Sequence, residues 1–185
     1  MIDNKKYPKR KTLRLQGYDY SFHGDYFVTI VTQGRACRFG KIAVGEMILN
    51  EVGRMIDKCY GELGEKYDDV DCLDYVIMPN HLHFIIRLLS DTHHLPDLVR
   101  QFKSKTTVEY IKGVQQKGWP LFECRLWQRS YHDHIIRNEH AFNYIRNYIF
   151  QNPERWYYDK MNPICSSTPD EILQDIKELN SKNKR

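Results

Sequence analysis

The stretch 70-VDCLDYVIMPNHLHFIIRL-88 decides the predicted fold, because it holds two apolar runs separated by a proline and an asparagine. Residues 70–77 and 81–88 each have the length and β-branched composition of a strand. Pro79-Asn80 is typical of a turn. The sequence therefore predicts an antiparallel hairpin over residues 70–88.

The second of these strands has two different faces, since successive residues of a strand point to opposite sides. One face is apolar and consists of Leu82, Phe84, Ile86 and Leu88. The other consists of His81, His83, Ile85 and Arg87. We expect helices to cover the apolar face and to leave both imidazoles on the open face.

Further elements flank the hairpin in a familiar order. Hydrophobic periodicity predicts two more strands, 26–32 and 126–137, and three helices, 45–67, 96–116 and 139–151. The order βαββαβ with an added helix predicts an α+β protein with a ferredoxin-like antiparallel sheet. A short amphipathic helix is expected near the end, around Ile172, Ile176 and Leu179.

Composition indicates one soluble domain with an arm at each end. The chain has 185 residues, of which 41% are hydrophobic and 28% charged. We predict an arm over 1–20, a central domain over 21–157 and an extension over 158–185. With no apolar run of about 18 residues and no signal peptide, a cytoplasmic protein without a membrane partner is expected. Five cysteines without a CxxC pair favour reduced thiols.

The N-terminal arm is strongly basic. Residues 1–14 contain six lysines and arginines against Asp3 alone, whereas the whole chain has a net charge of +4. Such an arm suits contact with a polyanion. A solvated tail is the alternative.

The His81 and His83 pair has the spacing of a metal site. Their Cβ atoms are about 7 Å apart along the strand, so both imidazoles can converge on one ion. A lone HxH motif also occurs on ordinary half-buried strands, and a metal site needs further ligands. The helix 139–151 is free to cross the open face. Tyr144, Tyr148 and Asn152 follow one another at intervals of four residues, so they lie along one side of this helix. Aromatic packing beside Ile145 and Ile149 is the alternative for the tyrosines.

The order of several motifs resembles a known family. The HLH motif is similar to the His–hydrophobic–His signature of HUH nucleases, and 144-YIRNYIFQNPERW-156 resembles the helix of single-tyrosine HUH transposases. Across roughly residues 10–157 the chain resembles the REP-associated tyrosine transposases, chromosomal relatives of the transposases of the smallest bacterial insertion sequences. The other matching segments are 12–32, 76–86, 102–104 and 126–139.

This resemblance implies a reaction and a site. It implies metal-dependent cleavage and rejoining of single-stranded DNA through a 5′-phosphotyrosine, with Tyr148 as nucleophile and Tyr144 as the second candidate. It implies that His81, His83 and Asn152 bind Mg²⁺ or Mn²⁺, Gln151 being a neighbour of the third ligand. The implied partner is a DNA hairpin with an adjacent guide sequence, and the chain is expected to act as a monomer or homodimer.

Residues of several segments are candidates for holding DNA. Cationic side chains would contact phosphates and tyrosines would stack on unpaired bases, although each is also an ordinary surface residue. In the related transposases the N-terminal region helps to recognise the guide. The candidates are Arg10, Arg14, Tyr18, Tyr20, Arg100, Lys103, Lys105 and Arg129.

Two other functions stay open on sequence alone. A ferredoxin-like sheet can bind nucleic acid without chemistry, although HLHFIIRL lacks the aromatic pattern of RNA-recognition strands. A small metal hydrolase would use the HxH pair with a metal-activated water, and Asp74 is the nearest acidic candidate in the sequence. A second HxH, His132 and His134 around Asp133, is a competing metal pair by its local spacing, but it lacks a helix stripe aimed at it. Asp133 and His134 are read as residues that support the site or pack beside it.

Overall fold

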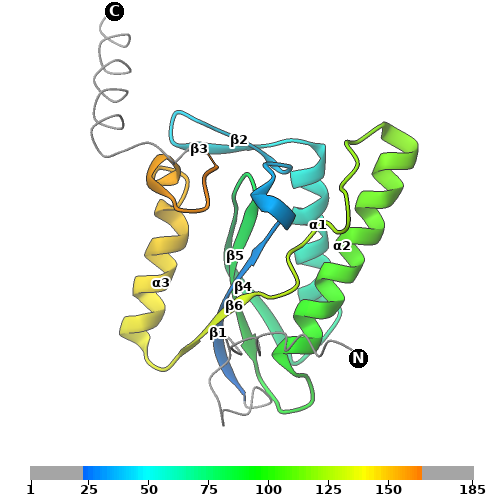
Figure 1. Cartoon of the computed structure of the whole chain (residues 1–185). Helices are drawn as coiled ribbons and strands as arrows, with labels where there is room; N and C mark the ends of the chain where they lie inside the picture. Colours follow the sequence, from blue (N-terminus) through cyan, green and yellow to red (C-terminus); the bar gives the residue numbers. More distant parts are fainter. Residues whose placement is uncertain (1–22, 164–185) are drawn as a thin grey trace, which may run out of the picture.

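The structure is a computed structural model that describes residues 23–163 (Figure 1). The basic arm and the helix predicted around Ile172 lie outside the described residues. The strands are β1 (Gly24–Val31), β2 (Gly40–Ala43), β3 (Glu46–Leu49), β4 (Val70–Ile77), β5 (His81–Leu88) and β6 (His132–Ile136). The helices are α1 (Glu51–Glu65), α2 (Leu95–Lys117) and α3 (Glu139–Gln151), with short 3₁₀ turns η1 (Gln33–Arg35) and η2 (Trp156–Tyr158).

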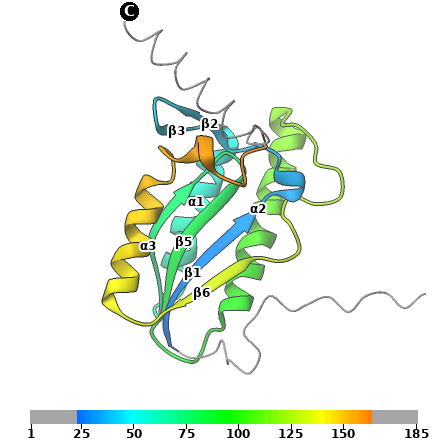
Figure 2. The same cartoon turned by 60° about the vertical axis from the view of Figure 1, so that its left-hand side comes forward.

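The main sheet has the ferredoxin-like strand order. Its four strands run β4-β5-β1-β6, and every neighbouring pair is antiparallel. Helices α1 and α2 lie on one side of this sheet and α3 on the other (Figures 1 and 2). The predicted α+β, ferredoxin-like fold with an added helix is confirmed.

Two hydrophobic clusters hold the layers together. The larger one joins the apolar face of β5 to α1 and α2 and includes Leu82, Phe84, Ile86, Tyr60 and Phe102. The smaller one fixes α3 to the other face through Ile85, Ile136, Ile145 and Ile149. The predicted division of β5 into a covered apolar face and an opposite face with both histidines is therefore confirmed.

Strand register aligns polar side chains across the open face. Thr29 of β1 lies opposite His83 of β5 on one side and His132 of β6 on the other. Directly opposed residues of antiparallel strands project to the same face. These three side chains therefore form a row across the sheet.

The predicted helix over 45–67 is wrong at its start. Residues 46–49 form β3, which pairs with β2 in a separate hairpin, and α1 begins at Glu51. The apolar residues Ile48 and Leu49, which appeared to fit the helical period, belong to this strand. Asn50 is the N-cap of α1: its backbone is still extended, and its side chain accepts a hydrogen bond from the N–H of Gly53.

The predicted strand over 126–137 is also too long. Only residues 132–136 pair with β1 in a continuous ladder, and Trp127 makes a single isolated bridge with Thr32. Leu126 and Trp127 are buried in the larger cluster, so their apolar character reflects loop packing rather than a strand. A short apolar run does not distinguish these cases.

Two glycines of α1 differ in how closely the helix approaches other parts of the chain at their positions. A Cβ atom at Gly53 would lie 2.2 Å from the carbonyl oxygen of Phe39, whereas a Cβ at Gly61 would meet nothing within 4 Å. Gly53→Ala is expected to lower the free energy of unfolding by about 1–3 kcal/mol through overpacking against backbone. Gly61→Ala is expected to raise it by about 0.5–1 kcal/mol, because alanine suits a helix interior better than glycine. Urea unfolding of both variants measures the difference, and equal effects would contradict the described packing.

Candidate active site

The two histidines of β5 meet at their outer nitrogens. Both side chains are buried, and His81 Nε2 lies 3.1 Å from His83 Nε2. The inner nitrogens have other partners: His81 Nδ1 is 2.8 Å from Asn80 Oδ1, and His83 Nδ1 is 2.7 Å from Thr29 Oγ1. Partners at Nδ1 fix the ring orientation and leave Nε2 of each ring facing the same space.

Asn80 determines the tautomer of His81. Its amide nitrogen donates to the carbonyl oxygens of Arg35 and Met161. The Asn80 oxygen is therefore the atom turned toward His81, and it accepts the hydrogen of Nδ1. Nε2 of His81 consequently keeps its lone pair.

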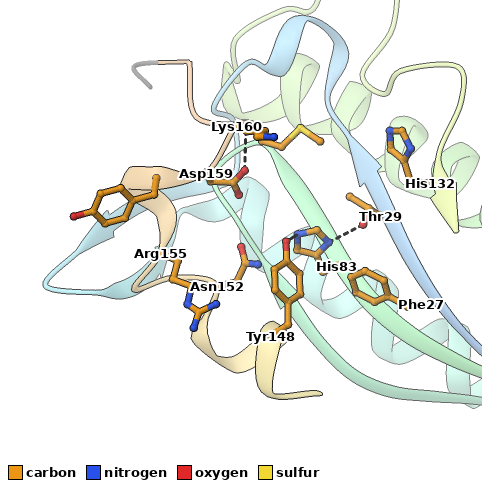
Figure 3. A pocket seen from close by; sticks show the side chains of 11 residues that line it. Phe27, Thr29, His83, His132, Tyr148, Asn152, Arg155, Asp159 and Lys160 are labelled. Carbon is orange, nitrogen blue, oxygen red and sulfur yellow. Dashed lines mark hydrogen bonds between the residues drawn. The ribbon is translucent and has the colours of Figure 1, made fainter. Parts of the chain in front are cut away.

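Helix α3 brings Tyr148 and Asn152 to the histidines. Asn138 caps the start of α3 by accepting a hydrogen bond from the N–H of Ala141, and Ile145 and Ile149 pack against the sheet. The hydroxyl of Tyr148 then lies 3.3 Å from His83 Nε2. Figure 3 shows Tyr148 and Asn152 pointing toward His83 from the same helix.

Their neighbours on the helix point elsewhere. Tyr144, the second candidate nucleophile, is 71% exposed, and Gln151 is exposed as well. Tyr148 and Asn152 are thus the tyrosine and amide that the fold brings to the imidazoles. Sequence spacing alone did not separate Tyr144 from Tyr148, since both lie on one stripe.

Asn152 connects the tyrosine with His81. Its hydrogen bonding offsets part of the lowering of the His81 pKa and part of the raising of the Tyr148 pKa that burial causes, so the amide lies beside both side chains. The residue is 3% exposed, and Oδ1 has no hydrogen-bond partner within residues 23–163. A buried acceptor without a partner is costly unless something binds it.

Burial controls protonation in this site. Desolvation lowers the pKa of His81 to about 4, against the raising effects of Asp159 and Asn152. Desolvation, together with the neighbouring His81, holds the pKa of His83 well below its ordinary value. Both rings are therefore neutral near pH 7. Burial raises the pKa of Tyr148, so its phenolate needs a nearby positive charge.

A turn after α3 covers the site. The ring of Trp156 lies 5.9 Å from that of His81, and Asp159 Oδ2 lies 3.6 Å from His81 Nε2. The sequence did not indicate Asp159, because an irregular turn has no periodic pattern. Asp74, the acidic candidate taken from the sequence, forms an ion pair with Arg146 of α3 instead, at 3.0 Å.

These elements enclose a cavity of about 820 Å³. Its lining includes Phe27 and Thr29 of β1, His83 of β5, and Tyr148 and Asn152 at the end of α3 (Figure 3). The turn beyond α3 contributes Arg155, Tyr158, Asp159, Lys160 and Met161. The cavity therefore has imidazole, phenol and amide groups together, with exposed cationic residues beside them. Its lining continues past residue 157, the predicted end of the central domain.

The second HxH motif lies on the edge strand β6. His132 and His134 are exposed and share the open face with Thr29 and Phe27, and His132 lines the cavity. Asp133 lies opposite Val28, whose side chain is in the larger core cluster. The register thus places His132 next to the site and Asp133 on the other face.

The predicted DNA-contacting residues have varied surroundings. Lys103 donates to the carbonyl oxygens of Gln128, Arg129 and Ser130, so it also anchors the loop before β6. Lys105 forms an ion pair with Glu62, and Arg100 forms one with Asp97. Arg129 is exposed. Arg10, Arg14, Tyr18 and Tyr20 lie outside the described residues.

The donor set fits a divalent cation. Two imidazole nitrogens face each other, and the nearby Asn152 has an amide oxygen without a hydrogen-bond partner among the described residues. Imidazole nitrogen suits divalent transition-metal ions, and amide oxygen suits Mg²⁺ and Mn²⁺. Within the described residues no group of three His, Cys, Asp or Glu side chains is placed to hold an ion. A site built on His81 and His83 therefore depends on the amide of Asn152.

Comparison with known proteins identifies the class. The family described as "Transposase IS200 like" matches residues 45–152, which include both histidines, Tyr148 and Asn152. The chain belongs to this transposase family, and its members process DNA. The family resemblance inferred from the sequence motifs is thereby confirmed.

Two curated proteins and one solved structure are similar to the chain. The chain is 33% identical over 166 residues to an uncharacterized protein of Haemophilus influenzae, covering 82% of this chain and 92% of that one. It is 24% identical over 143 residues to a protein of the same organism provisionally named a REP-associated tyrosine transposase, covering 76% of each. A REP-associated tyrosine transposase solved bound to a REP hairpin shares the fold, with a TM-score of 0.59, 18% identity and coverage of 80% of this chain and 77% of that one. None of the helices in residues 23–163 has the length and apolar character to cross a membrane.

Acidification is expected to destabilise the metal-free protein. The folded-state pKa values of His81 and His83 lie below the ordinary 6.5, so the unfolded chain takes up protons that the folded chain excludes. For His81, stability then rises with pH between about 4 and 6.5, by about 1.4 kcal/mol per pH unit, and His83 adds to the rise below 6.5. Urea unfolding in a chelator at several pH values measures this slope. His83→Gln should make it shallower, and an unchanged slope in that variant would contradict the assignment.

Proposed function

We propose that this transposase cleaves and rejoins single-stranded DNA with Tyr148 as its nucleophile, assisted by a divalent cation held by His81, His83 and Asn152. The observation that carries the proposal is the 3.3 Å distance between the Tyr148 hydroxyl and His83 Nε2. A phenol next to two neutral imidazoles and a free amide oxygen is a costly arrangement for a domain that only binds DNA.

In each step of the proposed reaction one phosphodiester bond forms and one breaks. The phenolic oxygen of Tyr148 bonds to phosphorus, the bond from phosphorus to the 3′-oxygen breaks, and the strand is released with a 3′-hydroxyl. The proton that Tyr148 loses is balanced by the one that the 3′-oxygen gains. In rejoining, a 3′-hydroxyl attacks the 5′-phosphotyrosine and returns the phenol.

Each side chain has a separate task in this proposal. Asn152 opposes, by hydrogen bonding, the burial that raises the pKa of the Tyr148 hydroxyl. Thr29 and Asn80 hold the two rings by their Nδ1 atoms. The cation, when bound, withdraws charge from the phosphoryl group and stabilises the leaving oxygen.

The partner we propose is a hairpin with a single-stranded segment beside it. The solved relative with this fold is bound to a REP hairpin. Arg155 and Lys160, exposed residues that line the cavity, are suited to contact the phosphates next to the cleaved bond. Tyr148 and His83 lie 3.3 Å apart within one chain, and we propose that they act together in that chain.

Tyr148→Phe is expected to abolish covalent attachment to the substrate, because phenylalanine has no oxygen to form the phosphodiester. The assay follows a labelled single-stranded hairpin oligonucleotide with Mn²⁺ by denaturing gel electrophoresis. Tyr144→Phe is the matched control, since its hydroxyl lies on the same helix but is exposed, and it should form the adduct.

The controls separate the rival functions. Adduct formation by Tyr148→Phe would overturn the assignment of the nucleophile. Metal-dependent cleavage without any adduct would favour a hydrolase that uses water. Binding without cleavage under all metal conditions would favour a non-catalytic module.

A further inference from the structure

The second HxH motif lies on an exposed part of the open face of the sheet. Strand β6 is the edge strand beside β1, and His132 and His134 are both exposed within residues 23–163 (Figure 2). Helix α3 packs on the same face, but the cluster that holds it there includes Ile136 as its one residue of β6. His132 and His134 therefore form an exposed strip of β6 beside the covered part of the face.

This strip lacks the ligands of a metal site. Asp133, between the two histidines, lies opposite Val28, whose side chain is in the larger core cluster, so Asp133 projects to the other face. No group of three His, Cys, Asp or Glu side chains within residues 23–163 is placed to hold an ion. The two exposed imidazoles are thus available to a ligand other than an ion.

Strand register joins the strip to the candidate active site. His132 lies opposite Thr29, which lies opposite His83, and Figure 3 shows Thr29 between the two histidines. Neighbouring strands are about 4.8 Å apart, so His132 is about 10 Å from His83 along this row. Each nucleotide of a stacked strand rises about 3.4 Å. A single strand with a phosphate at Tyr148 therefore reaches His132 within a few nucleotides.

His134 extends the strip along β6. It lies opposite Phe27, which lines the active-site cavity together with His132. The Cβ atoms of alternate strand residues are about 7 Å apart, and stacked bases are about 3.4 Å apart. A planar base therefore fits between the two imidazoles or against the outer side of either one.

Cationic side chains lie at both ends of the strip. Arg129 precedes β6 and Arg137 follows it, and both are exposed. Lys103 fixes the loop that carries Arg129 by donating to three of its carbonyl oxygens. Of the carboxylates near Arg137, Asp25 is already paired with an arginine of β5, whereas Glu139 is exposed. Phosphates on either side of bases held by the strip would thus meet an excess of positive charge.

We propose that His132 and His134 form a stacking surface for the unpaired bases next to the cleaved phosphate. This inference rests on the DNA-cleaving function proposed above, and it names the part of the DNA that the strip holds. Imidazole rings stack on unpaired bases as other aromatic side chains do, and such stacking accepts any base. Paired bases of a duplex are enclosed in their own stack, so the surface selects single-stranded DNA.

Two substitutions of His134 separate stacking from other roles. The probe is a fluorescent hairpin oligonucleotide with unpaired thymidine arms at both ends. His134→Ala removes the ring and is expected to weaken binding by about 5–20-fold, the lower part of the range for one lost base stack. His134→Tyr keeps a ring and should bind as the wild type does.

An exposed histidine elsewhere provides the matched control. His94 is exposed and precedes α2, and its side chain makes no capping hydrogen bond. His94→Ala should bind the probe as the wild type does. The same hairpin without arms is the second probe, and the wild type and His134→Ala should bind it equally.

Binding is measured by fluorescence anisotropy with the full chain in a chelator. The DNA then stays uncleaved, so the result is independent of the chemistry of Tyr148. Thermal unfolding checks that the variants are folded.

Photocrosslinking locates the contact without any substitution. With 5-iodouracil in the arms, irradiation is expected to attach the DNA to tryptic peptide 130–137, which contains both histidines. Fragmentation of this peptide in the mass spectrometer should place the DNA on His132 or His134. Crosslinks confined to other peptides would overturn the proposal.

The binding results have equally definite outcomes. Equal affinity of the wild type and His134→Ala for the armed hairpin, or no gain in affinity from the arms in the wild type, would overturn the stacking surface. A loss that His134→Tyr does not restore, or an equal loss with the armless hairpin, would also overturn it. Absence of the Tyr148 adduct, with the arm-dependent loss still present, would overturn only the proposed cleavage chemistry.

Discussion

Strand β5 pairs with β1 in a register that sets His83 opposite Thr29 and His81 opposite Val31, and the site depends on this register. A slip of one residue would turn both imidazoles into the apolar core and Phe84 out of it. The packing of Leu82, Phe84, Ile86 and Leu88 under α1 and α2 prevents that slip. The hydrophobic core thus selects the face on which the chemistry is placed.

The same arrangement explains how two imidazoles are tolerated in a buried position. Burial of a polar group without a partner is costly, and here Thr29 and Asn80 provide partners for the inner nitrogens. The outer nitrogens face each other, Tyr148, Asn152 and Asp159. The fold therefore gives one nitrogen of each ring a hydrogen-bond partner and leaves the other nitrogen available to the ion proposed above.

The sequence predicted those parts of the molecule that periodicity controls. The alternation of apolar and polar residues in β5 predicted the face of the sheet on which His81 and His83 lie. The four-residue spacing predicted that Tyr144, Tyr148 and Asn152 lie on one side of α3. Periodicity could not choose between Tyr144 and Tyr148, because the choice depends on where α3 crosses the sheet.

Other features lack a periodic signal altogether. The spacing of Ile48 and Leu49 fits a helix as well as a strand. The capping contact of Asn50 with Gly53 marks the start of the helix after both residues. Asp159 lies in an irregular turn whose position depends on Asn80 and Arg35, residues about 80 and 125 positions earlier in the chain. Contacts between residues so far apart in the sequence are tertiary, and local sequence patterns do not predict them.

The most direct test of the account is to find which residue carries the DNA after cleavage. Trypsin separates the two candidates, because Arg146 lies between Tyr144 and Tyr148 and the peptide 147–155 holds Tyr148 as its one tyrosine. After the reaction with a hairpin oligonucleotide and nuclease trimming, mass spectrometry should find the nucleotide on Tyr148 in peptide 147–155. A nucleotide on Tyr144 in peptide 138–146, or on any residue outside α3, would contradict the account.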